Sequence, residues 1–327
     1  APRRRREQAL GAPHGEQDVT PEARRTQKVL VIAGSTATGK TSTALTLAKR
    51  FDGELVGADS VQVYRGFDIG SAKPTADELE GVSHHLIDIV DPDDAIDAMV
   101  FAGHADNAID AIAERGKLPI VVGGTGLWIR ALLRGLVELP PVDAELRARL
   151  LNEGETLGRE ALHGRLQGLD PESASVIHPR DLVRVSRALE VYEQTGEKLS
   201  ALRAAHARGA DRYRSLFCVL PSPEDHDARI EARIDTMVEL GWKQETASLL
   251  QHWPRSARAF GSVGYAQMVR HLLDDVPWPE TRQAIRKATR IYARRQRTWF
   301  GGERGIDRSV PPAALLSDDH VKAWLAT

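Results

Sequence analysis

Two glycines, a lysine and a threonine at fixed spacing form the strongest chemical pattern in this chain. Residues 34–41 read Gly-Ser-Thr-Ala-Thr-Gly-Lys-Thr, between an apolar run and a helix-like segment. This order is typical of a phosphate-binding loop, in which backbone N–H groups and a helix N-terminus surround an anion. Lys40 adds a full positive charge, and the Thr41 hydroxyl can bind Mg²⁺. Most such loops hold a nucleoside triphosphate, so the remaining sequence must indicate whether this one does.

A second group of polar residues follows two other apolar runs. Asp59 comes directly after residues 54–58, and Thr125 follows residues 118–122 after two glycines. Ligands of parallel α/β sheets bind at the carboxyl ends of strands, so Asp59 and Thr125 are expected to face the phosphate loop across one crevice. With the Gln62 amide, they suit a nucleophile that must be positioned and deprotonated. The alternative is that Asp59 only caps a helix or turn.

The run 118–122 also bears on the choice of phosphate ligand. Nucleotide-hydrolysing enzymes with this loop place an acidic residue after a core strand to hold Mg²⁺, whereas this run ends in Gly-Gly-Thr. No Asn-Lys-x-Asp guanine-reading motif occurs in the chain, which counts against a GTPase.

These residues require a scaffold of alternating strands and helices. The expected strands cover residues 28–33, 54–58, 85–90, 118–122 and 215–220, and helices cover 40–51 and 101–115. Such alternation predicts an α/β fold, a P-loop-type parallel sheet with helices on both faces. Further helices are expected at about 224–240, 243–252, 262–273 and 279–299.

The chain is expected to divide into four parts. Residues 1–26 lack periodicity and predict a disordered basic tail, although the arginines could contact a polyanion. Residues 27–140 and 204–310 form the catalytic core. Residues 141–203 carry helical runs but no strand signals, which predicts a small all-helical insertion. We expect residues 311–327 to be a C-terminal tail.

Composition is that of an ordinary soluble protein. The 327 residues are 42% hydrophobic and 28% charged, with a net charge of −2, so any basic surface must be local. The single cysteine, Cys218, excludes an internal disulfide and a cysteine-built zinc site; it is either a core residue or, less in keeping with its apolar neighbours, a reactive thiol. We expect no secretory signal and no membrane span, and hence a cytoplasmic location.

Basic residues recur outside the phosphate loop. Arg184 and Arg187 are three positions apart, which places them on one helix face. Arg286, Arg290 and Arg294 follow one another at intervals of four, and no acidic residue occurs between Arg282 and Arg297. Such a stripe indicates either a surface that follows nucleic-acid phosphates or a solvated helix face.

Ordered motifs over residues 28–300 resemble the bacterial tRNA dimethylallyltransferases, the tRNA isopentenyltransferase family. The motifs are Gly34–Thr41, Asp59–Tyr64, Asp68–Pro74, His84–Asp88, Gly123–Trp128, Ile177–Pro179, Arg187–Tyr192, Gly264–Tyr265 and Thr289–Phe300. The second and third motifs carry most of the weight, because many enzymes share the first.

The resemblance implies transfer of a dimethylallyl group from its diphosphate to N6 of adenosine 37 in tRNA. The phosphate loop then holds diphosphate, with Lys40 and a Mg²⁺ on Thr41 neutralising charge on the leaving group. Asp59 accepts the proton of N6, and Thr125 orients the amine or the donor. The implied diphosphate-binding residues are Gly34, Ser35, Thr36, Ala37, Thr38, Gly39, Lys40 and Thr41.

The resemblance also implies that the insertion grips the anticodon arm of the tRNA substrate. We expect the chain to act as a monomer. The implied tRNA contacts are Asp59, Ser60, Val61, Gln62, Thr125, Arg147, Val183, Arg184, Val185, Ser186 and Arg187. Two departures from the family pattern affect the phosphate site. Ser35 stands where proline is common, and Pro223 stands where many members have an arginine near the diphosphate.

Three other functions compete with this interpretation. A transferase acting on free adenine nucleotides would not need the 141–203 insertion. A kinase should show a lid with arginines and an acid after a core strand, and a non-catalytic RNA-binding module would not need Lys40 and Asp59.

Overall fold

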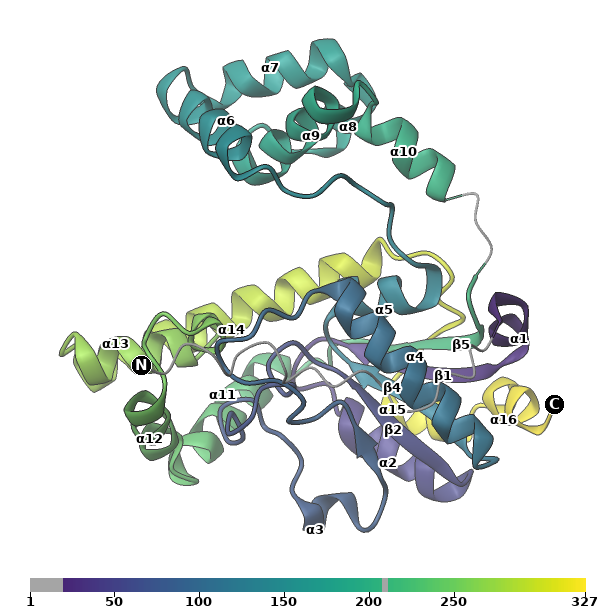
Figure 1. Ribbon diagram of the computed structural model, residues 1–327. Helices are drawn as coiled ribbons and strands as arrows, with labels where there is room; N and C mark the ends of the chain where they lie inside the picture. Colours follow the sequence, from purple (N-terminus) through teal and green to yellow (C-terminus); the bar gives the residue numbers. More distant parts are fainter. Residues whose placement is uncertain (1–19, 208–210) are drawn as a thin grey trace, which may run out of the picture. The chain divides into compact units, whose positions relative to one another are not determined.

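The computed structural model describes residues 20–207 and 211–327, in two compact units (Figure 1). The core unit comprises the chain up to Leu133 together with Arg212–Thr327, and the helical unit comprises Arg134–Asp211. The helical unit thus extends beyond the expected insertion, 141–203, at both ends. Residues 1–19, most of the expected tail, lie outside the described residues.

A six-stranded parallel sheet forms the centre of the core unit, in the order β3-β2-β4-β1-β5-β6. The strands are β1 (Lys28–Gly34), β2 (Gly53–Ala58), β3 (His84–His85), β4 (Leu118–Gly123), β5 (Arg214–Leu220) and β6 (Arg308–Ser309). In register, Leu30 of β1 lies opposite Ile120 and Leu216. The expected parallel α/β sheet is confirmed, and the loop after β1 leaves the sheet at its middle.

The expected strand at 85–90 is wrong in most of its length. Only His84 and His85 pair with β2, although Val90 makes an isolated bridge to Tyr64. Leu86 and Asp88 have φ values of 63° and 56°, which are left-handed and interrupt the extended backbone. The end of the segment instead hydrogen-bonds to residues 63–65, and of its apolar side chains Leu86 and Val90 are buried.

Helices cover both faces of the sheet. They are α1 (Pro21–Thr26), α2 (Lys40–Arg50), α3 (Ala76–Leu79), α4 (Ala98–Glu114), α5 (Gly126–Arg134), α11 (His226–Glu239), α12 (Trp242–His252), η1 (Arg258–Gly261), α13 (Tyr265–Leu273), α14 (Trp278–Gly301), α15 (Pro312–Ser317) and α16 (Asp319–Ala326). The long expected helices are confirmed. α4 packs on the face opposite α2, and Trp128 of α5 stacks on its Phe101.

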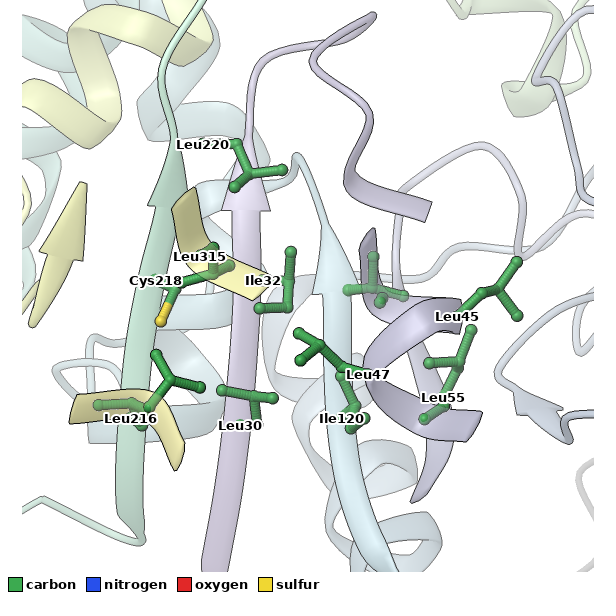
Figure 2. Packing of buried hydrophobic residues seen from close by; sticks show 14 residues of the cluster. Leu30, Ile32, Leu45, Leu47, Leu55, Ile120, Leu216, Cys218, Leu220 and Leu315 are labelled. Carbon is green, nitrogen blue, oxygen red and sulfur yellow. The ribbon is translucent and has the colours of Figure 1, made fainter. Parts of the chain in front are cut away.

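The hydrophobic core beneath α2 corrects the expected C-terminal tail. Leu30 and Ile32 of β1 pack there with Leu47 of α2 and with Leu315 of α15 (Figure 2). Leu315 and Val321 are each 1% exposed. Residues 311–327 are therefore part of the core unit, because α15 and α16 bury these side chains against the sheet.

Residues 20–26 also differ from the expected disordered tail. The Thr20 hydroxyl accepts a hydrogen bond from the N–H of Ala23 and caps α1. Arg24 of this helix forms ion pairs with Asp106 and Asp110 of α4. These contacts hold α1 on the core unit.

The helical unit contains α6 (Ala144–Thr156), α7 (Arg159–Leu169), α8 (Pro171–Val176), α9 (Leu182–Thr195) and α10 (Leu199–His206). Its core includes Leu150, Leu166, Val185 and Leu189. No strand occurs in the described residues of this unit, as the sequence predicts.

Candidate active site

A cavity of about 810 Å³ lies at the carboxyl ends of β1, β2 and β4. The phosphate loop supplies one wall, including Thr36, Ala37, Lys40 and Thr41, and residues 59–62 supply another. The expectation that Asp59 and the loop share one crevice is confirmed, whereas Thr125 lies behind Ser60 and is not among the lining residues. α11, α12 and α14 complete the lining.

The loop has the backbone that its glycines predict. Gly34 and Gly39 have φ values of 152° and 84°, and a Cβ on Gly34 would lie 2.7 Å from the carbonyl oxygen of Leu220. Lys40 begins α2, and its Nζ donates a hydrogen bond of 2.7 Å to the carbonyl oxygen of Ser35. The ammonium group thus lies over the loop at the helix N-terminus.

Gln296 of α14 joins the phosphate loop to the loop after β4. Its Oε1 accepts a hydrogen bond from the N–H of Thr36, and its Nε2 donates one to the carbonyl of Gly124, both at 2.9 Å. A Cβ on Gly124 would lie 2.3 Å from Nε2, so the close approach requires glycine. The motif containing Gln296 was recognised in the sequence, but this contact was not foreseen.

Asp59 both caps a turn and faces the cavity. Its Oδ1 accepts hydrogen bonds from the N–H groups of Val61 (2.9 Å) and Gln62 (3.3 Å). Because both bonds use Oδ1, Oδ2 is available for a ligand. The two sequence-based interpretations of Asp59 are therefore compatible.

Thr125 and Tyr292 lie beside Asp59. The Thr125 hydroxyl accepts a hydrogen bond of 3.1 Å from the N–H of Ser60. The Tyr292 hydroxyl lies near the Thr125 and Ser60 side chains, and burial together with the charge of Asp59 raises the pKa of Tyr292 to about 12. Tyr292 therefore stays protonated and can act as a donor in this network.

Gln62 supports a neighbouring loop. Its Nε2 donates hydrogen bonds to the carbonyl oxygens of Ser71 and Ala72, at 3.2 and 3.1 Å. Both donors of the amide are thus used within the core unit, which leaves only its oxygen for a substrate.

Arg233 of α11 is a second cation in the cavity, and sequence reasoning missed it. Burial and then the positive charge of Arg233 lower the pKa of Lys40 to about 8, while Asp59 opposes the shift. Burial likewise lowers the pKa of Arg233. Within the described residues neither cation forms an ion pair with a carboxylate, and Arg233 donates to the carbonyl of Ser71 at 3.4 Å. Two such cations beside an anion-binding loop indicate a strongly charged anionic ligand.

The residues expected to contact RNA from the helical unit do not share one exposed surface. Val183 is 67% exposed and the Arg184 side chain 65%, whereas Val185 and Ser186 are 0% and 1% exposed. Direct side-chain contacts by Val185 and Ser186 are therefore wrong, because α9 turns these positions into the core of the unit.

Arg147 and Arg187 are engaged inside the helical unit. Both pair with Glu190, which is fully buried, and Arg187 also donates to the carbonyl oxygen of Pro140. Their charge is thus partly neutralised, and they hold α6 and the start of the unit against α9.

Most of the basic stripe on α14 is neutralised as well. Arg286 and Arg290 pair with Glu231, and Arg282 pairs with Asp235, both acids of α11. Of the expected stripe Arg286, Arg290 and Arg294, the first two are therefore engaged in ion pairs within the core unit. Three exposed arginines lie further along α14, and none of them forms an ion pair among the described residues. They are Arg294, Arg295 and Arg297.

Together the parallel sheet, the phosphate loop, the two cations of the cavity and the facing carboxylate define a P-loop protein with a site for an anionic ligand. Comparison with known proteins gives the family. Residues 62–303 match the family model described as IPP transferase, and the chain belongs to this family.

Curated relatives are similar over most of the chain. The tRNA dimethylallyltransferase of Sorangium cellulosum (strain So ce56) is 51% identical over 274 residues, 84% of this chain and 87% of the relative. That of Anaeromyxobacter sp. (strain K) is 46% identical over 286 residues, 87% of this chain and 93% of the relative.

Two solved structures are also similar to this chain over most of its length. The tRNA isopentenylpyrophosphate transferase of Bacillus halodurans superposes with a TM-score of 0.67 at 35% identity, covering 92% of this chain and 97% of that one. A eukaryotic dimethylallyltransferase acting on tRNA gives a TM-score of 0.70 at 28% identity, covering 91% of this chain and 78% of that one.

Proposed function

We propose that this chain transfers a dimethylallyl group from dimethylallyl diphosphate to N6 of adenosine 37 in tRNA and releases diphosphate. The observation that carries the proposal is the placement of the phosphate loop and Asp59 on the walls of one cavity. The names of the curated relatives support the same reaction.

The donor's diphosphate binds in the phosphate loop between Lys40 and Arg233. As the allylic C–O bond breaks, negative charge grows on the diphosphate, and two desolvated cations stabilise it more strongly than exposed ones would. Pro223 stands where many members of the family have an arginine near the diphosphate. Arg233 compensates for that missing arginine, because it supplies the second positive charge from α11.

The five-carbon group lies against an apolar wall of α11 and α12. Ile230, Ile234 and Met237 follow one another at helical spacing and line the cavity together with Trp242. This wall keeps water from the allylic carbon while the C–O bond breaks.

Asp59 and its neighbours serve the acceptor. The N6 amine forms the new C–N bond, the diphosphate leaves with the electron pair of the C–O bond, and Asp59 Oδ2 takes the N6 proton. Thr125 holds the backbone next to Asp59 through the N–H of Ser60, and Tyr292 lines the cavity beside them. The adenine must leave the anticodon-loop stack to reach this cavity.

The donor set beside the loop also fits Mg²⁺. Proteins bind this ion through a few of their own oxygens together with substrate phosphates and water, and Thr41 lines the cavity at the phosphate loop. Thr41 would hold the ion, which would neutralise diphosphate oxygens. Within the described residues no cluster of three or more His, Cys, Asp or Glu side chains offers another metal site.

The tRNA backbone contacts the exposed residues of both units. Val183 and Arg184 present one surface, and Arg294, Arg295 and Arg297 present another whose charge no described carboxylate neutralises. Because one chain forms the whole cavity, we propose that a monomer acts on cytoplasmic tRNA. No described helix is both long and apolar enough to cross a membrane.

Incubation with dimethylallyl diphosphate, Mg²⁺ and a tRNA with adenosine 37 tests the proposal, with the products identified by mass spectrometry of nucleosides. We expect N6-prenylated adenosine from the wild type and none from Asp59→Ala. Equal transfer to free AMP would refute tRNA as the acceptor. Release of ADP from ATP without prenyl transfer would refute the reaction.

A further inference from the structure

A histidine outside the cavity lining holds the peptide group between Thr36 and Ala37. The Nε2 atom of His226, at the start of α11, lies 2.8 Å from the carbonyl oxygen of Thr36 and 3.5 Å from Ser35 Oγ. A carbonyl oxygen can only accept, so Nε2 carries the proton and donates it. His226 is 5% exposed and Ser35 is 2% exposed, so water competes little for this contact.

The preceding peptide group is fixed from both ends. The N–H of Thr36 donates to Gln296 Oε1, and the carbonyl of Ser35 accepts from Lys40 Nζ (2.7 Å) and Thr38 Oγ1 (2.9 Å). The hydroxyl of Ser35 is also hydrogen-bonded, 3.1 Å from Ser222 Oγ. Side chains therefore restrain the loop on both sides of Thr36. In relatives with proline at the position of Ser35, the proline ring would restrict the backbone there by itself.

Ala37 is the residue that needs this restraint. Its φ of 61° is left-handed, a conformation that a residue with a Cβ adopts only when its surroundings enforce it. In a trans peptide the C=O and N–H groups point in opposite directions. A donor that fixes the Thr36 carbonyl on the His226 side thus turns the N–H of Ala37 to the other side, and Ala37 lines the cavity.

We propose that His226 is a positioning residue of the diphosphate site. Its Nε2–H holds the Thr36 carbonyl, and the N–H of Ala37 consequently points at the diphosphate. The inference rests on the proposed function, because it takes diphosphate as the occupant of the loop. His226 acts through the backbone and does not touch the donor.

Three variants of His226 distinguish the effect of its hydrogen bond from the effect of the volume that its ring fills. Glutamine places an amide nitrogen at the reach of His Nε2, asparagine places it one bond short, and leucine fills space without a donor. The probe is inorganic diphosphate with Mg²⁺, titrated by calorimetry against each full-length variant. We expect His226→Leu and His226→Asn to weaken binding about two- to tenfold, which is the range for one lost neutral hydrogen bond. His226→Gln should stay within about twofold of the wild type.

Kinetics and thermal unfolding distinguish positioning from a general structural role. The KM for dimethylallyl diphosphate should rise in the Asn and Leu variants, while the KM for tRNA stays that of the wild type. Equal diphosphate affinity for the wild type and for His226→Asn would overturn the inference, as would a parallel rise of both KM values with a lower Tm. If His226→Leu does not fold, the Asn and Gln variants decide the question alone. Failure of the wild type to bind diphosphate would instead refute the proposed occupant, and this inference with it.

Discussion

Replacing Arg233 by glutamine removes one of the two cations that we place at the diphosphate. A hydrogen bond to a charged group contributes about 1.5–3 kcal/mol, so kcat/KM for dimethylallyl diphosphate should fall about 10- to 150-fold. Arg233→Lys keeps the charge but loses the planar fork of donors, and its loss should be smaller. The KM for tRNA should change little, because we place Arg233 at the diphosphate and not at the acceptor base.

The same substitution should change the pH profile. Burial and the charge of Arg233 lower the pKa of Lys40 to about 8. Lys40 is charged below that pH and neutral above it, so kcat/KM of the wild type should decline as pH rises through about 8. Without Arg233 one of the two causes is gone, the pKa of Lys40 rises, and the decline should begin at a higher pH.

Steady-state kinetics at saturating tRNA between about pH 6.5 and 9.5 would test both effects. Arg229 of the same helix is the matched control, because it is exposed and pairs with Asp225 at 2.8 Å. Arg229→Gln should leave the rate and the profile unchanged. A fall of less than about threefold in Arg233→Gln, with the alkaline decline in its wild-type position, would refute the assignment of Arg233 to the diphosphate.

Four further outcomes are expected. Asp59→Asn should lower kcat by about 10²- to 10⁴-fold without weakening diphosphate binding in calorimetry, since only a proton acceptor is lost. EDTA should abolish transfer, and excess Mg²⁺ should restore it; full activity in EDTA would exclude the metal. Leu315→Ala should cost about 2–5 kcal/mol in chemical unfolding, and an unchanged stability would contradict the role of α15 in the core. Arg295→Ala should reduce the slope of log Kd for tRNA against log salt by about 0.7–0.9 in filter binding, and Arg290→Ala by less, because Glu231 already neutralises Arg290.

Local sequence patterns predict most of the fold. The phosphate loop, the central strands and the long helices each have a periodicity or a glycine pattern within a short window, and those predictions are confirmed. Asp59 could be placed near the loop because parallel strands end at one edge of the sheet. No comparable local rule covers the segment 85–90, where Leu86 and Asp88 turn left-handed.

Contacts between distant segments explain what the sequence could not show. The arginines of α14 appear as an uninterrupted basic run, because their partners Glu231 and Asp235 belong to another helix. Arg233 looks like one more charge in an alternating series on α11, and only the packing of that helix shows that it enters the cavity. Residues 311–327 are too short to show their hydrophobic face clearly, and Leu315 reveals its role only against β1 and α2.

α11 connects these observations. His226, Ile230, Arg233 and Met237 are separated by four, three and four positions, so they form one stripe, which holds the loop and lines the cavity. Asp227, Glu231 and Asp235 form a second stripe, rotated by roughly a third of a turn, that pairs with the arginines of α14. Because a helix is rigid, ion pairs on the second stripe fix the rotation of the first. We therefore propose that the paired arginines of α14 serve the diphosphate site by orienting α11, and that Arg294, Arg295 and Arg297 contact the tRNA phosphates.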